Sequence, residues 1–257
     1  MPITPIIEPT TSLKNARIGY KNLLTASSNT EAAKMLIPNT FERFVSGPAS
    51  YTLKFQLSEI AAIDFIAIGA HNAGTHSGGV NILVKYATTI GGALTAIENL
   101  EFADNGAKMI LFDEIEVAEI ALVFNVPVGL ELGVIYAGKS LEMQRSIYGG
   151  NSPIDLNAKT EYQSTMSDSG QFLGRSIVRQ GVKTSFSWQH LTDDWVRNTF
   201  MPFVNSAKTT PFFMVWKPEL YDQAVFGYTT DDVKLSNMGG GHKLMTASFN
   251  MTGHQDT

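Results

Sequence analysis

Alternation of apolar and polar residues along short segments is the feature that most limits how this chain can fold. Residues 51–57 (YTLKFQL) alternate without interruption, and the same spacing recurs at 80–86, 182–188 and 245–251. Successive side chains of a β-strand point to opposite faces, so this spacing predicts strands with one buried face. The segment 63–70 (IDFIAIGA) is apolar on both sides instead, which predicts a strand covered on both faces.

Shorter β-rich segments follow at 108–112, 119–125 and 132–138, separated by turn-forming residues. Several short strands of this kind, with hardly any helical periodicity between them, are typical of β-sandwiches and jelly rolls. We therefore expect an N-terminal β-sandwich over about 15–140, and we assign residues 1–145 to that domain.

The composition changes at 146–171, which is polar, rich in turn residues and only weakly periodic. Such a tract predicts either an ordinary linker between domains or an extended arm. We place the domain boundary there. Residues 172–257 return to strand-like alternation and predict a small β-barrel or sheet, so the whole chain is expected to be mainly β.

One helix is predicted to pack on this C-terminal domain, over about 192–207. Thr192 can cap it, and Asp193 and Asp194 would lie in its first turn, beside the positive end of the helix dipole. Apolar residues three or four positions apart give the segment one apolar face. Pro202 lies inside this pattern and predicts a kink or an early end of the helix.

Charge and cysteine content exclude several classes of function. The net charge is −5 and the 19 Lys and Arg residues form no long basic run, so no nucleic-acid partner is expected. The chain has no cysteine, which excludes disulfides, thiolate zinc sites and cysteine nucleophiles. No apolar run reaches the roughly 18 residues that a membrane helix needs, so we expect no membrane insertion. The first residues (MPITPIIEPTTS) do not resemble a secretory signal, which predicts assembly in a cytoplasm.

The segment 65–79 (FIAIGAHNAGTHSGG) runs from an apolar strand into a glycine-rich loop that carries His71, Asn72, Thr75 and His76. The two histidines are five residues apart, a spacing that suits metal ligands neither on a helix nor on a strand, so no metal site is predicted. A turn between two strands explains the loop, with Asn72 bonding the backbone of its own turn. The turn is the favoured interpretation, and a ligand loop formed by the four side chains at one end of a sandwich stays open.

The sequence contains no arrangement typical of catalysis. A G-x-S-x-G nucleophile motif is absent, and carboxylates that are neighbours in sequence, such as Asp193 with Asp194 and Asp231 with Asp232, usually diverge. The glycines of 238–243 (MGGGHK) precede a strand-like segment, whereas a phosphate-binding loop precedes a helix. We therefore expect a protein that is not an enzyme and needs no cofactor. A hydrolase that uses His71 or His76 is the least favoured interpretation.

The first half resembles the discoidin-like jelly roll of the coagulation factor type C group. The segments that carry the resemblance are 51–72, 80–89 and 119–124. Members of that family bind glycans, lipid head groups or proteins through loops at one end of the sandwich. The resemblance implies a similar role for the loop at 71–79.

The second half resembles structural proteins of tailed bacteriophages, in the distal tail or tail-tip group. The resemblance is carried by 169–181, 194–207, 211–218 and 226–232. It implies a small β-barrel hub, related to tail-tube proteins, that closes into a ring joining the tail tube to the tip or baseplate.

Together the two resemblances imply a structural component of a virion tail, assembled in the cytoplasm of a bacterial host. The implied partners are further copies of the chain, in a ring taken to contain six, neighbouring tail proteins, and a host-surface glycan. The alternative is a carbohydrate-binding module for cell-surface recognition, with 71–79 as its main loop.

Overall fold

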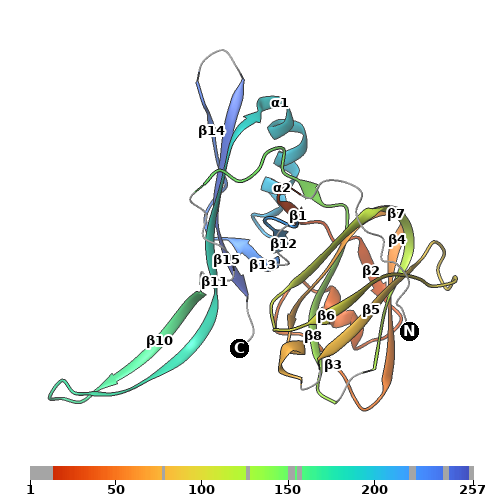
Figure 1. Cartoon of the computed structure of the whole chain (residues 1–257), viewed down its shortest axis with the longest axis horizontal. Coiled ribbons are helices and arrows are strands. Elements are labelled where there is room, and N and C mark those ends of the chain that lie inside the picture. The colour runs from red at the N-terminus through yellow and green to blue at the C-terminus, as the bar shows by residue number, and fades with distance from the viewer. Residues whose placement is uncertain are drawn as a thin grey trace.

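The structure is a computed structural model, shown in Figure 1. It describes residues 14–76, 79–125, 128–149, 154, 158–219, 224–239 and 243–254. Some of the sequence-predicted segments extend outside the described residues: the start of the N-terminal domain at 1–13, the loop at 77–78, the polar tract at 150–153 and 155–157, and the second glycine tract at 240–242.

The described residues form two antiparallel sheets and one helical segment, so the chain is mainly β, as the alternation predicted. The N-terminal sheet contains β2 (Leu24–Ser27), β3 (Phe44–Val45), β4 (Ser50–His71), β5 (Val80–Ala87), β6 (Thr95–Phe102), β7 (Lys108–Asn125) and β8 (Glu131–Gly138), with the 3-10 turns η1 (Ala32–Leu36) and η2 (Ala73–Thr75) between strands. The C-terminal sheet contains β1 (Arg17–Gly19), β9 (Leu141–Glu142), β10 (Ala158–Met166), β11 (Phe172–Thr192), β12 (Phe212–Val215), β13 (Ala224–Thr229), β14 (Lys234–Asn237) and β15 (Leu244–His254). The helical segment consists of α1 (Asp193–Trp195), the π-type turn η4 (Val196–Phe200) and α2 (Met201–Ser206).

The N-terminal sheet folds over into a jelly-roll sandwich because its longest strands, β4 and β7, each pair with neighbouring strands in both their first and their last parts. The first part of β4 pairs with β2 and the end of β7, and its last part pairs with β8 and the start of β7. Register shifts after Gln56 and Ile63 separate the two parts of β4, and such bulges bend a strand. The predicted β-sandwich is confirmed, with its own core of buried residues from both layers.

β4 is covered on both faces at 65–68, as its sequence predicted, and each of these residues is at most 1% exposed. Ile66 and Ile68 belong to the core of the sandwich. Phe65 and Ala67 point the other way and pack against the C-terminal sheet. Both sides of this part of β4 are therefore apolar because one side faces the core of the sandwich and the other faces the C-terminal sheet.

A third core joins the two sheets. It brings together Phe65, Ala67, Val134 and Tyr136 of the N-terminal sheet and Phe213, Val215, Ala224 and Phe226 of the C-terminal sheet. The ring centroid of Phe213 lies 5.3 Å from that of Tyr136 and 4.6 Å from that of Phe226. A Cβ added at Gly69 would lie 3.1 Å from the Phe213 ring, so glycine permits this close approach. The two sheets therefore share an apolar contact.

Two short strands from the first 145 residues join the C-terminal sheet. β1 and β9 belong to the first 145 residues but pair in the C-terminal sheet, where Ile18 lies opposite both Met214 and Leu141. Strands of two or three residues carry too little periodicity to be recognised in a sequence. β12 offers the edge on which β1 pairs, and β1 in turn offers the edge on which β9 pairs.

A continuous helical segment occupies residues 193–206, within the predicted range. It buries Phe200 and Phe203 against the C-terminal sheet, where the rings of Phe203 and Phe249 lie 5.9 Å apart. The chain takes the π-type turn η4 just before Pro202, whose ring and missing N–H disturb regular helical bonding. In the described part of the chain, no helix is both long and apolar enough to span a membrane.

The predicted capping role of Thr192 is wrong in detail. Thr192 occupies the cap position, but its side chain makes no capping bond to the helix. Its hydroxyl instead accepts a hydrogen bond from Nε2 of Gln144 at 3.0 Å, and its N–H donates to Oε1 of Gln144 at 2.8 Å. Gln144, in the segment after β9, thus binds the hydroxyl group that would otherwise cap the helix.

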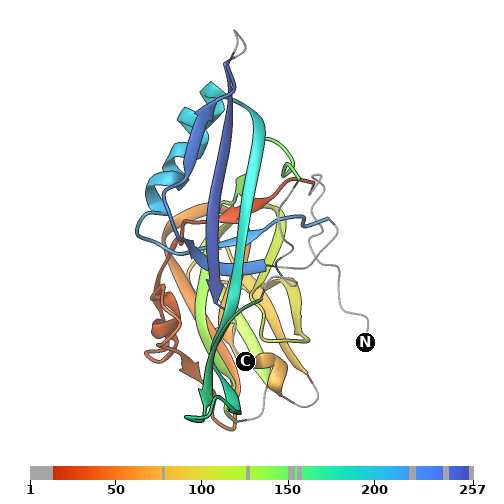
Figure 2. The ribbon, with the colours of Figure 1, turned by 90° about the vertical axis from the view of Figure 1, so that its left-hand side faces the viewer.

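Residues 158–166 of the polar tract form β10, which pairs with the first part of β11 in a two-stranded hairpin. We call β10 together with residues 172–182 the arm. Figure 1 shows the arm leaving the C-terminal sheet and standing clear of both bodies. Figure 2 shows that it continues the line of β11 beyond the end of β15.

Candidate binding site

His71, the first of the predicted ligand residues, is fully buried at the end of β4. Its Nε2 lies 2.8 Å from the carbonyl oxygen of Gly106, and its Nδ1 accepts the N–H of Ala73 at 3.3 Å. Because Nδ1 accepts, the ring is neutral and the proton on Nε2 is donated to Gly106. The ring edge also contacts Phe102, with centroids 4.6 Å apart. His71 therefore holds the loop to the sandwich.

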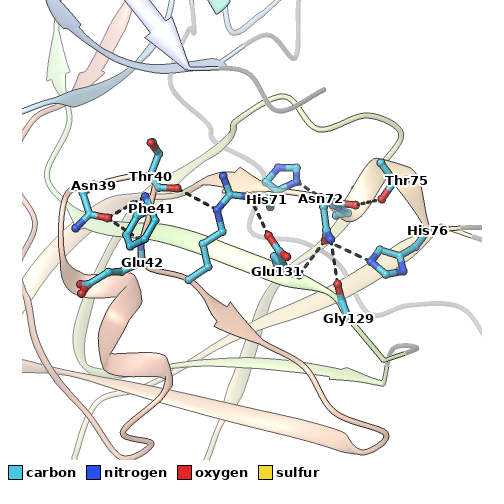
Figure 3. A network of polar contacts seen from close by, with 12 residues as sticks. Asn39, Thr40, Phe41, Glu42, His71, Asn72, Thr75, His76, Gly129 and Glu131 are labelled. Atoms are coloured by element: carbon cyan, nitrogen blue, oxygen red, sulfur yellow. Dashed lines mark hydrogen bonds and ion pairs between the residues drawn. The ribbon is translucent and has the colours of Figure 1, made fainter. Parts of the chain in front are cut away.

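Asn72, Thr75 and His76 bond mainly to their own loop and to the start of β8 (Figure 3). Oδ1 of Asn72 accepts the N–H of Glu131 at 2.8 Å, and its Nδ2 donates to the carbonyl of Gly129 at 3.0 Å. Nε2 of His76 lies 3.3 Å from the same Oδ1, and the Thr75 hydroxyl donates to the carbonyl of Asn72 at 2.7 Å. The structure thus brings these three residues together, whereas His71 bonds elsewhere.

The carboxylates singled out in the sequence hold ordinary structural contacts. Oδ1 and Oδ2 of Asp193 accept from Nε of Arg197 at 2.9 Å, and this bond lowers the pKa of the carboxyl. Hydrogen bonds from Asn250 and Thr230 lower the pKa of Asp231 in the same way. A general acid needs a raised pKa, so both groups are tuned in the opposite direction. Among the described residues, no group of three or more His, Asp or Glu could hold a metal ion.

Two ionisable groups that sequence reasoning missed lie near the contact between the sheets. Burial raises the pKa of Asp64, whose carboxylate accepts the N–H of Ser140 at 2.6 Å and lies 4.0 Å from Arg17. Burial also raises the pKa of Tyr136 to about 12, and its hydroxyl donates to the carbonyl of Pro211 at 3.1 Å. Each group connects residues far apart in the sequence, so both are interpreted as structural.

A surface that the sequence did not single out lies in the loop before β3. The side chain of Phe41 is 92% exposed, the highest value among the large apolar residues described. Oδ1 of Asn39 accepts the N–H groups of Phe41 and Glu42, at 3.0 and 2.8 Å, and Nε of Arg43 donates to the carbonyl of Thr40 at 3.0 Å. Figure 3 shows these bonds around the Phe41 ring. The loop is thus fixed while its aromatic side chain stays in water.

This surface is continuous with the predicted loop through β8. A guanidinium nitrogen of Arg43 donates to Oε2 of Glu131 at 3.1 Å, and the backbone N–H of Glu131 donates to Asn72. The residues that line an open hollow of about 640 Å³ here are Lys34, Thr40, Phe41, Glu42, Arg43, Val45 and Glu131. The asparagine two residues before Phe41 is the one local signal of this turn, because Asn side chains commonly bond the backbone two residues on.

The arm carries a second exposed apolar surface. Tyr162 pairs with Ile177 and Met166 with Phe172, so these four side chains share one face of the hairpin, with the Ser164–Arg175 pair between them. The guanidinium of Arg175 lies over the Tyr162 ring, 3.4 Å from its centroid. The opposite face carries polar or small residues, at 163, 165, 174 and 176. The arm is therefore amphipathic.

No family model matches the chain, and no curated protein matches its sequence. A solved structure of a pectin-binding carbohydrate-binding module shares 15% identity with it, with a TM-score of 0.40, over 46% of this chain and 91% of the module.

Two further solved structures are similar to the same extent. The chitosan-binding module 1 of a chitosanase/glucanase from Paenibacillus sp. IK-5 shares 14% identity, with a TM-score of 0.37, over 46% of this chain and 97% of the module. The module CBM32-1 of a family 31 glycoside hydrolase from Clostridium perfringens shares 12% identity, with a TM-score of 0.37, over 51% of this chain and 98% of the module. All three are carbohydrate-binding modules that match about half of this chain, and values this low assign no ligand to it.

Proposed function

We propose that the protein is a structural subunit that assembles with further copies of itself and with neighbouring proteins through its arm. One observation carries the proposal: Tyr162, Met166, Phe172 and Ile177 lie on one face of a hairpin that leaves the body, and they are 48–66% exposed. In the described part of the chain, Arg175 lies over the Tyr162 ring, and the four apolar side chains otherwise stay largely exposed.

An arm of this kind lacks the packing that would stabilise it. A two-stranded hairpin is only marginally stable in water. By register, the apolar face continues from Val182, whose side of the sheet is covered in the body by Phe203 and its neighbours. Covering exposed apolar surface contributes about 25 cal/mol per Å². A partner packed on the arm would therefore stabilise both the arm and the contact.

A ring follows if the arm of each copy contacts a different patch on the next copy, because repeated head-to-tail contacts around an axis can close. Weak contacts then add up through multivalency. The finer proposal is a ring of six copies in the distal tail or tail tip of a bacteriophage. The resemblance of the C-terminal segments to such proteins supports this finer assignment.

Light scattering and electron microscopy of the purified chain test the proposal. We expect ring-shaped particles, and we expect the pair of substitutions Phe172→Ser and Ile177→Ser to convert them to monomers. A matched control, Ile60→Ser with Ile90→Ser, removes equally exposed apolar side chains from the N-terminal body and should leave the particles intact. A wild-type chain that stays monomeric at all accessible concentrations would contradict the proposal.

Glycan binding by the jelly roll is the second candidate function. The observation that favours it is the exposed ring of Phe41, held beside charged side chains on a fixed loop. Carbohydrate-binding modules are also among the structures to which about half of this chain is similar. A stable monomer that binds oligosaccharides would favour this candidate, and ring-shaped particles would favour the first.

A further inference from the structure

We propose that the surface around Phe41 is a binding site for a neutral oligosaccharide. The inference rests on the second candidate function and gives it a site and a class of ligand. The site consists of the loop at 38–43 together with Lys34, Val45 and Glu131.

The site is organised before any ligand arrives. The Asn39 side chain accepts the backbone N–H groups of Phe41 and Glu42, which fixes the backbone on both sides of the Phe41 Cα, and Arg43 fixes the carbonyl of Thr40. Holding a large apolar side chain in water gains nothing for the isolated chain. A ligand that covers the ring would gain contact area without ordering a loop, which keeps the entropic cost of binding low.

An aromatic face recognises one side of a sugar ring. Several C–H groups of a pyranose point to the same side and form a small apolar patch with positive hydrogens. The π-face of phenylalanine is negative and apolar, so it attracts that patch. Phe41 is exposed enough for a sugar to lie flat on its ring.

Hydrogen-bonding groups of both kinds surround the ring. Arg43 offers N–H donors, and the carboxylates of Glu42 and Glu131 offer acceptors, which matches hydroxyl groups that both donate and accept. The side chain of Glu131 is 40% exposed although it is paired with Arg43. A sugar hydroxyl can therefore reach it without breaking the ion pair.

The balance of charge favours a neutral ligand. Arg43 is paired with Glu131 and Lys34 with Glu31, so both cations near the ring already have a carboxylate partner. Glu42 adds a further negative group to the lining. A phosphate, a sulfate or an acidic sugar would be repelled by these carboxylates.

A protein partner fits this surface less well than a sugar. The centres of protein–protein interfaces are depleted in Lys and Glu, whereas Lys34, Glu42 and Glu131 line this hollow. The apolar part is limited to Phe41 and Val45, and a standard interface buries about 800 Å² on each partner. An open hollow beside one aromatic ring suits one or two sugar units.

The predicted loop at 71–79 is a weaker site on the same evidence. His71 is buried, and Asn72 uses its side-chain amide to hold the start of β8. Thr75 is the one exposed residue of the four predicted ligands. The structure therefore favours the neighbouring loop as the ligand surface.

The test is a titration of the full chain with lactose, cellobiose and diacetylchitobiose, followed by NMR and calorimetry. We expect at least one of them to bind with a Kd of about 1 mM. Phe41→Ala should weaken binding about tenfold or more, and Phe41→Trp should retain it because an aromatic face remains. Ile90→Ala, which removes an exposed apolar side chain from the turn between β5 and β6, is the control and should bind as the wild type does.

The possible outcomes distinguish a failure of this site from a failure of glycan binding as a whole. Binding that survives Phe41→Ala but is lost in Thr75→Ala would place the site at 71–79 and overturn this inference while leaving glycan binding intact. A wild type that binds none of the three sugars would overturn both. If Phe41→Ala instead changes the size of the particles, the surface contacts a second copy of the chain and the sugar assignment is wrong.

Discussion

His71 illustrates how a residue with catalytic chemistry can serve only the fold. An exposed histidine in a glycine-rich loop would be available to a ligand, but this one lies under the loop and bonds the carbonyl of Gly106 and the N–H of Ala73. The polar groups it satisfies are themselves buried or nearly so. Its contribution is therefore to stability.

Replacing His71 by leucine should lower the free energy of unfolding by about 1–3 kcal/mol, because two backbone groups would lose their partner. Thr75→Ala, at an exposed position of the same loop, should change it by less than about 0.5 kcal/mol. Chemical denaturation monitored by circular dichroism measures both. Equal effects of the two substitutions would argue against this role of His71.

Asp64 should make stability depend on pH in an unusual direction. Burial raises its pKa in the folded chain above 3.8, the ordinary value for an aspartate, so the folded state binds the proton more tightly than the unfolded state does. By linkage, the contribution of this group to stability falls as pH rises from 3.8 through the folded pKa. Asp64→Asn removes that contribution and can still accept the N–H of Ser140. We therefore expect the variant to gain stability relative to wild type as pH rises through this window; a constant difference would contradict it.

At the scale of elements, the arm differs from every other strand pair in having an apolar face and no cover in the described part of the chain. Its register links that face to the buried side of β11, so the same alternation that builds the core also builds the arm. Sequence alternation alone cannot separate the two cases, because it reports which face is apolar and not what lies on it.

Limited proteolysis can test whether the apolar face of the arm is covered in the assembled particles. Trypsin should cut after Arg175 in the Phe172→Ser, Ile177→Ser variant, because a two-stranded hairpin opens locally at little cost. Cleavage there should be several-fold slower in assembled wild-type particles. Arg17, whose side chain is 11% exposed and paired with Glu142, should resist in both samples and serves as the internal control. Equal rates at Arg175 would show that the arm is not covered on assembly.

At the scale of the whole molecule, the third core makes the two bodies one folding unit. Tyr136 and Phe213 are buried by each other's sheets, and β1 extends the C-terminal sheet from the N-terminal end of the chain. Neither body keeps its surface covered without the other. The polar tract that begins near residue 145 therefore does not separate two bodies that are each stable alone.

Denaturation of the full chain should show one transition. The three tryptophans, Trp188, Trp195 and Trp216, all belong to the C-terminal body, whereas far-ultraviolet circular dichroism reports both bodies. We expect the two signals to change together, and Phe213→Ala to shift both to lower denaturant, with a loss of about 3–5 kcal/mol. A shift of the fluorescence signal alone would mean that the bodies unfold separately.

The sequence by itself determined the longer alternating strands, the doubly covered segment of β4 and the single helix, because side-chain period and helix signals are local properties. Tertiary structure decided the rest. Arg17 lies opposite Val215, His71 bonds Gly106, and no local pattern specifies such distant partners. The candidate site shows the same division: alternation and turn residues located the loop at 71–79, but only the packed structure reveals that its side chains are engaged and that Phe41 is exposed.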